Sequence, residues 1–305
     1  MYTIKEASAR SGVGIPLLRA WERRYGVVVP TRTSSGYRLY DDAAIGRLQA
    51  MRQLIGAGWS AKQAADRVRG ASDADFPELA SSASFDAMQG TAGEGSPAED
   101  LVTRLVTAAR VIDATGLEAA LDEAFSSARF EIAADRVVMP ALRAIGDAWE
   151  RGDISVAGEH AASHAVLRRL AMAYEAAGDP GDERPVLVGL GAGSRHELGA
   201  FAFAVAARRA GLPVLYLGPD LPADEWTSAA AERDARAAVI GVATRADVRR
   251  AMKVLGALRS TRPRMLLAAG GDQAARAARA TDALELPESL STAVAAVREA
   301  LASAS

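Results

Sequence analysis

Cysteine is absent from this sequence, and other features that direct a protein to a compartment are missing as well. Without cysteine the chain has neither disulfides nor thiolate metal sites, which is compatible with a reducing cytoplasm. No apolar run reaches membrane-spanning length, and no charged-then-apolar leader opens the chain. We therefore expect a cytoplasmic protein that has no contact with a membrane.

Histidine and the aromatic residues are scarce. The three histidines are His160, His164 and His196, and aromatic residues make up 5% of the chain. Histidine is a good ligand for cobalt, iron or zinc, and it changes its charge near neutral pH. All three lie in the C-terminal two-thirds of the sequence, which makes that part the candidate for a ligand site.

The net charge of −2 conceals an uneven distribution of charged residues. Residues 1–70 contain 12 Lys+Arg and 5 Asp+Glu, whereas the remaining 235 contain 24 and 33. A basic segment on an acidic body indicates that only the first part meets a polyanion such as nucleic acid. A chance imbalance on a solvated surface explains these counts equally well, so charge alone does not decide.

The length favours two or three domains, and the pattern along the chain places their boundaries. Residues 1–70 are expected to form short helices around a hairpin with its tip at Ser34-Ser35-Gly36. Residues 71–98 contain no Lys or Arg and are rich in Ser, Ala, Gly and acids, which predicts a flexible acidic linker. Residues 99–178 have a helical period with three breaks, which predicts a four-helix bundle.

The remainder, residues 183–305, alternates short apolar runs with amphipathic helical segments. The runs cover residues 185–190, 213–217, 237–242, 265–269 and a weaker one at 283–286. Such alternation is typical of βαβ units and predicts a doubly wound, Rossmann-like α/β domain with a parallel sheet. The predicted fold class is therefore multidomain: a winged helix-turn-helix, a four-helix bundle and an α/β domain.

The second predicted helix, residues 16–25, has the properties of a DNA-reading helix. Its apolar residues can face a core while Arg19 and Arg23, one turn apart, share another face. Arginine on such a helix can grip guanine in the major groove or simply hold a phosphate. Arg32 and Arg38 flank the hairpin tip, where a wing would lie against the DNA.

Residues 1–70 resemble the mercury-resistance-regulator (MerR) family of transcription factors. The matching segments are Tyr2-Thr3-Ile4, residues 18–26, Pro30-Thr31-Arg32 and residues 36–40. Within that family, the form of residues 19–25 is similar to the photoreceptor branch of the CarH and LitR type. The resemblance implies DNA contacts by Arg19, Arg23, Arg24, Arg32, Tyr37 and Arg38. The alternative for any one of them is a solvated or packing side chain. It also implies dimers on two-fold DNA sites.

His196 directly follows the first predicted strand of the α/β domain and is surrounded by glycines. Ligands of such sheets bind beyond the carboxyl ends of the strands, so a histidine there points into the ligand crevice. Glycines allow a bulky ring to approach the backbone. A phosphate loop is the competing interpretation, but neither the dinucleotide spacing nor the Lys-Ser/Thr ending is present.

The spacing after this strand resembles the cobalamin-binding fold, which has Asp-x-His-x-x-Gly, then Ser-x-Leu, then Gly-Gly. The corresponding residues are His196, Gly199, Gly241, Gly270 and Gly271. The resemblance implies that His196 binds the corrinoid cobalt from below. Two positions depart from the pattern, because Ser194 replaces the acid that orients the histidine, and Gly241 and Ala243 replace Ser and Leu. A hydroxyl at 194 can accept an imidazole N–H bond but has no charge.

The helical part resembles the cap of the CarH-type bundle, in which Trp-x9-Glu-His covers the upper face of the corrinoid. Here Trp149 is followed by Glu159 and His160, and the resemblance implies that all three line the pocket. The alternatives are an ordinary core tryptophan and ordinary helix histidines. A zinc site on His160 and His164 is a weaker alternative. Photoreceptor members have a second histidine just after the tryptophan, where this chain has Glu150.

Together these patterns predict a transcriptional regulator, not an enzyme. Its sensor would bind adenosylcobalamin, with cobalt held through the corrinoid, and light or ligand would control assembly into dimers or tetramers on an operator. RNA polymerase would be a further partner. One alternative is a sensor that binds another tetrapyrrole, another small molecule or nothing. Another is a corrinoid methyl-transfer module, for which the chain lacks the length of a methyl-donor domain.

Overall fold

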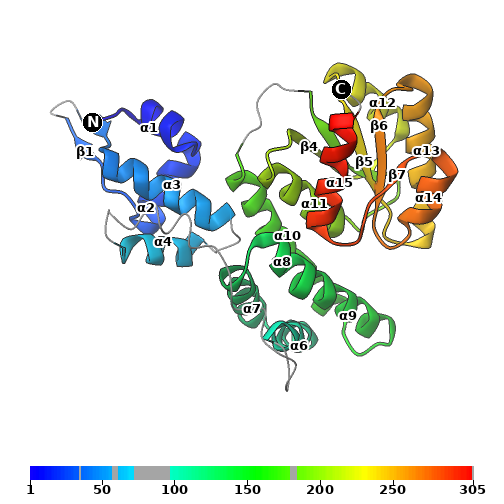
Figure 1. Cartoon of the computed structure of the whole chain (residues 1–305). Coiled ribbons are helices and arrows are strands. Elements are labelled where there is room, and N and C mark those ends of the chain that lie inside the picture. Colours follow the sequence, from blue (N-terminus) through cyan, green and yellow to red (C-terminus); the bar gives the residue numbers. More distant parts are fainter. Residues whose placement is uncertain (34–35, 57–60, 72–96, 179–183, 304–305) are drawn as a thin grey trace. The chain divides into compact units, whose positions relative to one another are not determined.

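The computed structural model describes residues 1–33, 36–56, 61–71, 97–178 and 184–303 (Figure 1). By its contacts the chain divides into two compact units, Met1–Gly178 and Asp179–Ser305. Most of the predicted linker 71–98, the hairpin tip at 34–35 and the predicted break at 58–60 lie outside the described residues. None of the described helices is long and apolar enough to cross a membrane.

The first unit begins with a helix-turn-helix and a small antiparallel hairpin. Its elements are α1(Ile4–Ser11), α2(Ile15–Tyr25), β1(Thr31–Arg32), β2(Arg38–Leu39), α3(Asp42–Gly56) and α4(Ala61–Arg69). Thr3 caps α1 by a capping box with Glu6, as its sequence predicts. Gly12 ends α1 with φ 68°, a left-handed conformation that favours glycine, and this makes the turn into α2 tight. The hairpin β1–β2 is the predicted wing.

Helices make up the rest of the first unit. They are α6(Pro97–Arg110), α7(Ala114–Ser127), α8(Phe130–Ala133), the π-helical turn η2(Ala134–Val138), α9(Met139–Glu150) and α10(Val156–Ala176). The α8, η2 and α9 segments follow one another without a break, so the described residues contain four helical rods, as predicted. Asp113 and Ser155 cap α7 and α10 by accepting backbone N–H bonds. Pro140 lies in the first turn of α9, directly after the π turn.

Close packing joins α10 to its neighbours in this unit. A Cβ on Gly158 would run into the carbonyl oxygen of Ala109, so α10 approaches α6 more closely than any other residue would allow. At its other end α10 packs against α3, where Ala176 belongs to the same apolar cluster as Leu18 and Leu48. Helix α10 therefore takes part in the cores of both the bundle and the helix-turn-helix.

The second unit is a parallel five-stranded sheet covered by helices on both faces (Figure 1). The strands are β3(Val186–Gly191), β4(Val214–Leu221), β5(Ala237–Gly241), β6(Leu266–Gly270) and β7(Leu284–Glu285). The helices are α11(Leu198–Arg209), α12(Ala223–Glu232), α13(Arg245–Thr261), α14(Ala274–Thr281) and α15(Leu290–Ser303). Helices α11 and α15 pack together on one face, and α12, α13 and α14 pack in a row on the other. This is the predicted doubly wound fold.

The order of the strands is β4-β3-β5-β6-β7, so β3 has its successor on one side and β5 on the other. The connections after β3 and β5 therefore leave the sheet in opposite directions, and their carboxyl ends are the usual ligand position in such folds. Strand β4 runs four residues beyond its predicted end. It stays paired with β3 through two register shifts around Gly189, where a Cβ would press on the backbone of Gly218.

Candidate DNA surface and corrinoid site

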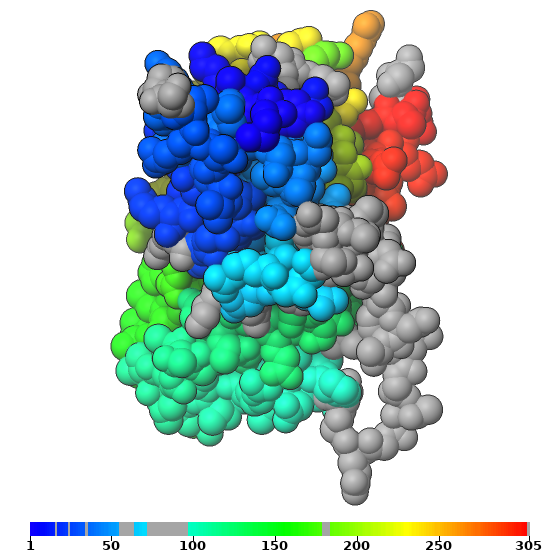
Figure 2. Space-filling view, turned by 90° about the vertical axis from the view of Figure 1, so that its left-hand side faces the viewer, coloured from blue at the N-terminus to red at the C-terminus, as the bar shows by residue number. Residues whose placement is uncertain are grey.

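Helix α2 places its apolar and basic side chains on opposite faces. Leu18 and Trp21 are 0% and 2% exposed, whereas Arg19 and Arg23 are exposed. Arg32 in the wing is exposed as well. Figure 2 shows the molecular surface of the N-terminal residues in blue. An exposed pair of guanidinium groups one turn apart on a buried apolar base is the arrangement that a major groove requires.

The wing is fastened to α2 through a glutamate. The Nε of Arg38 donates to Oε1 of Glu22 at 3.0 Å, and the hydroxyl of Tyr40 donates to its Oε2 at 3.2 Å. Burial, and then the nearby Glu22 carboxylate, raises the pKa of Tyr40 to about 12. Arg38 therefore positions the wing, a role that its sequence position did not reveal. Tyr37, also predicted to contact DNA, is 74% exposed.

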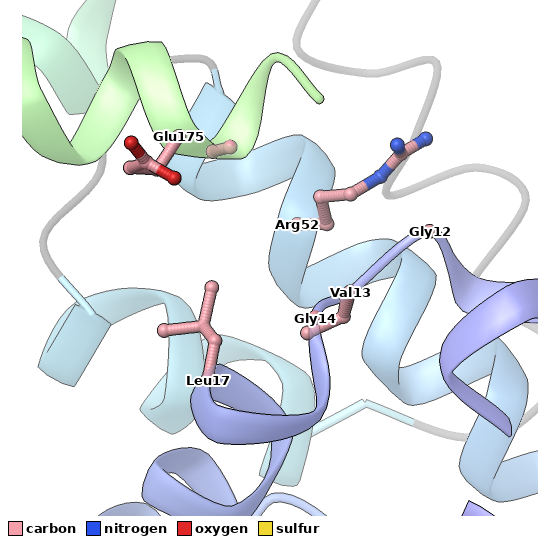
Figure 3. A pocket seen from close by; sticks show the side chains of 7 residues that line it. Gly12, Val13, Gly14, Leu17, Arg52 and Glu175 are labelled. Carbon is pink, nitrogen blue, oxygen red and sulfur yellow. The ribbon is translucent and has the colours of Figure 1, made fainter. Parts of the chain in front are cut away.

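A small cavity lies beside the turn of the helix-turn-helix (Figure 3). Its volume is about 210 Å³, below the roughly 300–1,000 Å³ of ordinary small-molecule pockets. It is lined by Gly12, Val13, Gly14, Leu17, Arg52, Glu175 and Ala176. The cavity marks where the end of α10 lies against the turn, and its size argues against a ligand site.

His196 lies in the loop between β3 and α11, and its side chain is 66% exposed. The imidazole is therefore exposed at the carboxyl end of β3 and does not lie in a packed core. Asp220 fixes the backbone of this loop by two hydrogen bonds. Its Oδ1 accepts the N–H of Gly193 at 2.6 Å, and its own N–H donates to the Ser194 carbonyl. Gly193 has φ 81°, a left-handed conformation that keeps this turn short.

Ser194 does not face the crevice as its position in the motif suggests. It is 1% exposed, and its hydroxyl donates to Oδ1 of Asp247 at 2.6 Å. Asp247, in the first turn of α13 after β5, is itself 0% exposed. Its Oδ2 lies 3.8 Å from Nδ1 of His196. A buried carboxylate therefore lies near the imidazole, although position 194 itself has none.

The Asp247 carboxylate is held in its charged form by a full set of donors. Oδ1 also accepts from Nη1 of Arg250 at 3.0 Å, and Oδ2 accepts the N–H and the hydroxyl of Thr244 at 3.0 and 2.7 Å. Burial by itself raises the pKa of Asp247, but the hydrogen bonds from Ser194, Thr244 and Arg250 outweigh it, and the pKa is lowered. A buried negative charge therefore faces the exposed imidazole.

Gly241 and Gly270 of the motif are the last residues of β5 and β6, and Gly271 follows directly. A Cβ on Gly241 would lie 3.1 Å from the Cβ of Ala200, and one on Gly271 would lie 2.8 Å from a backbone oxygen of Val242. Only glycine fits these two places without movement. Gly199 has open space around it. The exposed imidazole and the adjacent buried carboxylate form a donor pair that suits a transition-metal ion, and Gly199 adds no side chain beside them.

The predicted cap residues lie at the junction of α9 and α10. Trp149 is 47% exposed, so the alternative of an ordinary core tryptophan is wrong. The Glu159 carboxylate accepts from the Ser163 hydroxyl and lies 2.6 Å from Nδ1 of His160, whose side chain is 64% exposed. Among the described residues no group of three or more His, Asp or Glu could hold a metal ion, which removes support for the zinc alternative.

Comparison with known proteins identifies both parts of the first unit. Residues 2–70 match the family model described as "MerR HTH family regulatory protein". Residues 101–174, which include most of the bundle, match the model described as "B12 binding domain". These matches agree with the resemblances found in the DNA-reading helix and in the Trp-x9-Glu-His cap.

Two similar curated proteins are repressors from Myxococcus xanthus. The chain is 32% identical over 225 residues to the HTH-type transcriptional repressor CarH, covering 73% of each chain. It is 27% identical over 222 residues to the repressor CarA, covering 72% of this chain and 69% of that protein. Both relatives are repressors and not enzymes, which agrees with the prediction of a regulator.

A solved structure shares the fold of much of the chain. The monomethylamine corrinoid protein of Methanosarcina barkeri aligns with a TM-score of 0.55 at 14% identity, covering 66% of this chain and 98% of that one. At this identity the likeness shows the fold alone. Together with the two family models and the identity to CarH, it leads to one conclusion. The chain belongs to the MerR family of DNA-binding transcriptional regulators, in the group that carries a B12-binding domain.

Proposed function

We propose that this regulator binds adenosylcobalamin with His196 as the lower cobalt ligand, and that ligand and light control its binding to an operator. The observation that carries the proposal is the exposed imidazole of His196 beside the buried Asp247 carboxylate, at the point where the strand order reverses. When bound, the corrinoid would supply a cobalt–carbon bond that light can break.

Residues of both units would take part in holding the ligand. His196 would bind the metal, and Gly199, Gly241, Gly270 and Gly271 would leave room for the corrinoid and its tail. Ser194 would act through the carboxylate to which it donates a hydrogen bond. Trp149, Glu159 and His160 would also hold the ligand, with the indole supplying apolar surface and the polar pair supplying hydrogen bonds.

Ligand binding would act on DNA binding by a shift in population. Because the proposed ligand residues come from both units, the liganded chain would favour one arrangement that assembles into homodimers or homotetramers. An assembly that presents several DNA-binding modules gains affinity without new base contacts. Loss of the ligand in light would release the assembly. We place this regulator in the cytoplasm, with RNA polymerase as a further partner.

The DNA contacts of each module would come from α2 and the wing. The proposed residues are Arg19, Arg23, Arg24, Arg32, Tyr37 and Arg38. We propose the corresponding division of the chain into a DNA-binding domain (1–70), a linker (71–98), a helical cap (99–178) and a corrinoid domain (183–305). Arg38 would touch phosphate only with the part of its guanidinium that Glu22 leaves free.

The visible spectrum of the purified full-length chain mixed with adenosylcobalamin in the dark tests the sensor. We expect a base-off, His-on spectrum and retention of the cofactor on gel filtration, with both lost in His196→Ala. His164→Ala is the matched control, because His164 is an exposed histidine outside the proposed ligand set. If the wild type neither retains the cofactor nor shows the spectrum, the corrinoid assignment fails, and ligand extraction with mass spectrometry would look for another tetrapyrrole.

A gel-shift titration on the operator tests the DNA surface. The double variant Arg19→Ala/Arg23→Ala should abolish specific binding without unfolding the domain, because both side chains are exposed. Arg67→Ala removes an exposed arginine of α4 and serves as the control for net charge. Unchanged operator affinity of the double variant would remove this assignment. Repeating the titration in dark and light, with and without the cofactor, tests whether the sensor controls it.

A further inference from the structure

The loop after β3 and the start of α13 after β5 are in contact, because the Ser194 hydroxyl donates to the buried carboxylate of Asp247. Asp247 is 0% exposed, and its Oδ2 lies 3.8 Å from Nδ1 of His196. This distance is slightly longer than a hydrogen bond. Metal-binding histidines commonly donate their other ring N–H to a carboxylate, which sets the tautomer and raises the basicity of the ligating nitrogen. The motif residue at 194 is a serine and supplies no carboxylate, and the Glu197 carboxylate of the same loop accepts from the Tyr216 hydroxyl.

We propose that Asp247 is the positioning residue for His196: it draws Nδ1–H toward Oδ2 and leaves Nε2 as the free nitrogen that faces the crevice. This inference rests on the proposed function for the identity of the metal, but the orientation of the ring is a property of the ligand-free chain. Ser194 then has a supporting role, because its hydroxyl fixes the other carboxylate oxygen.

The hydrogen bonds that Asp247 already accepts determine which donor must leave when the His196 N–H binds. A carboxylate accepts about four hydrogen bonds, and Ser194, Arg250 and the two groups of Thr244 already supply four. Of these, the Thr244 hydroxyl shares Oδ2 with the approaching imidazole, and it can rotate away without moving the backbone. The Thr244 N–H cannot, since it is part of the cap on α13. We infer that the hydroxyl gives way when the imidazole N–H arrives.

Asp247 therefore has two roles, in capping α13 and in orienting His196, and the variants must separate them. Asp247→Asn removes the charge and keeps the shape. Thr244→Ala removes the competing hydroxyl, which is also the Thr244 half of the capping box on α13, and keeps the N–H that Asp247 accepts. The double variant Ser194→Asp/Asp247→Asn returns a carboxylate to the loop of His196, where it cannot accept the Thr244 N–H that caps α13.

The first measurement is the His-on fraction of the full-length chain with adenosylcobalamin in the dark. Asp247→Asn should weaken coordination by the imidazole on the order of 10- to 100-fold, the usual effect of removing such a partner. Thr244→Ala should keep or strengthen it, and the double variant should restore it while its melting temperature stays as low as that of Asp247→Asn. If Asp247→Asn coordinates like the wild type, or if the double variant restores nothing, the proposal is overturned.

The second measurement needs no cofactor. Nitrogen-15 shifts of the neutral imidazoles report which ring nitrogen carries the proton, and with three histidines the His196 signals can be assigned from His196→Ala. We expect the Nδ1–H tautomer in the wild type and its loss in Asp247→Asn. An identical tautomer in both would refute the orienting role. If the tautomer depends on Asp247 but the wild type binds no corrinoid, the proposed function fails and the orientation of His196 stands.

Discussion

Replacing Gly158 by alanine should loosen the bundle, although the same replacement stabilises most helices. Gly158 lies in the first turn of α10, where the helix crosses α6. An added Cβ would overlap the carbonyl oxygen of Ala109 and lie 3.0 Å from Cγ2 of Ile154. A backbone carbonyl within α6 cannot turn away, so relief requires that α10 move away from α6.

The magnitude follows from two opposing contributions. Alanine in place of glycine in a helix gains up to about 1 kcal/mol, whereas forcing a methyl group into a packed contact costs about 1–3 kcal/mol and occasionally more. Because the obstacle here is backbone, we take the upper end of that cost and expect a net destabilisation of about 2 kcal/mol. Gly146→Ala in α9 is the matched control, since no atom outside its own helix lies within 4 Å of the added Cβ, and it should be neutral or stabilising.

Hydrogen exchange of the full-length chain measures this locally. Amides of α6 and α10 should exchange faster in Gly158→Ala, by a factor of about thirty for 2 kcal/mol, while the sheet of the second unit keeps its protection. Glu159 and His160 should lose protection as well, because they follow directly in the chain. Equal or greater protection of α6 and α10 in Gly158→Ala would refute the reasoning about close helix contact.

Two further expectations follow from burial and charge. Trp149 is 47% exposed, so Trp149→Ala should lower the free energy of urea-induced unfolding by much less than the about 3–5 kcal/mol of a buried tryptophan. Trp226 is fully buried, and Trp226→Ala should reach that range. Similar losses in the two variants would contradict the exposure of Trp149. Tyr40 keeps its proton to a pKa of about 12 in the folded chain, against an ordinary value of 10.0. The unfolded chain therefore binds fewer protons between these values, and the helix-turn-helix should lose stability as the pH rises from about 10 to about 12. Tyr40→Phe should remove that dependence, and Glu22→Gln should lower the Tyr40 pKa in an ultraviolet titration; an unchanged pKa would exclude the Glu22 contact.

The elements could be predicted because their signals are local. The capping residue Thr3 and the alternation of apolar runs after residue 183 depend on near neighbours in the chain. The prediction fell short at the end of β4, because the strand is prolonged by irregular pairing with β3 around Gly189. That pairing depends on the position of a different strand, which the periodicity of residues 213–217 does not contain.

The same distinction explains which site residues were found. His196 follows from a local rule, since a residue just after a buried parallel strand lies at the ligand edge of the sheet. The contact between Arg38 and Glu22 was missed because it joins the wing to α2 across 16 residues. Asp247 was missed because Thr244-x-x-Asp247 has a sufficient local explanation as a helix cap, and nothing local indicates that the cap also faces a histidine loop.

The order of strands makes the exchange of roles between positions 194 and 247 physically reasonable. Strands β3 and β5 are adjacent and in register over Val186–Gly189 and Ala237–Ile240, so the loops that follow them begin at the same level of the sheet. A carboxylate from either loop can reach the space below the imidazole, and a hydroxyl from the other can support it. A motif search along one loop treats Ser194 as the loss of an acid. In the proposed arrangement the Ser194 hydroxyl supports the Asp247 carboxylate that orients the imidazole, so the departure at 194 does not argue against a metal-binding His196.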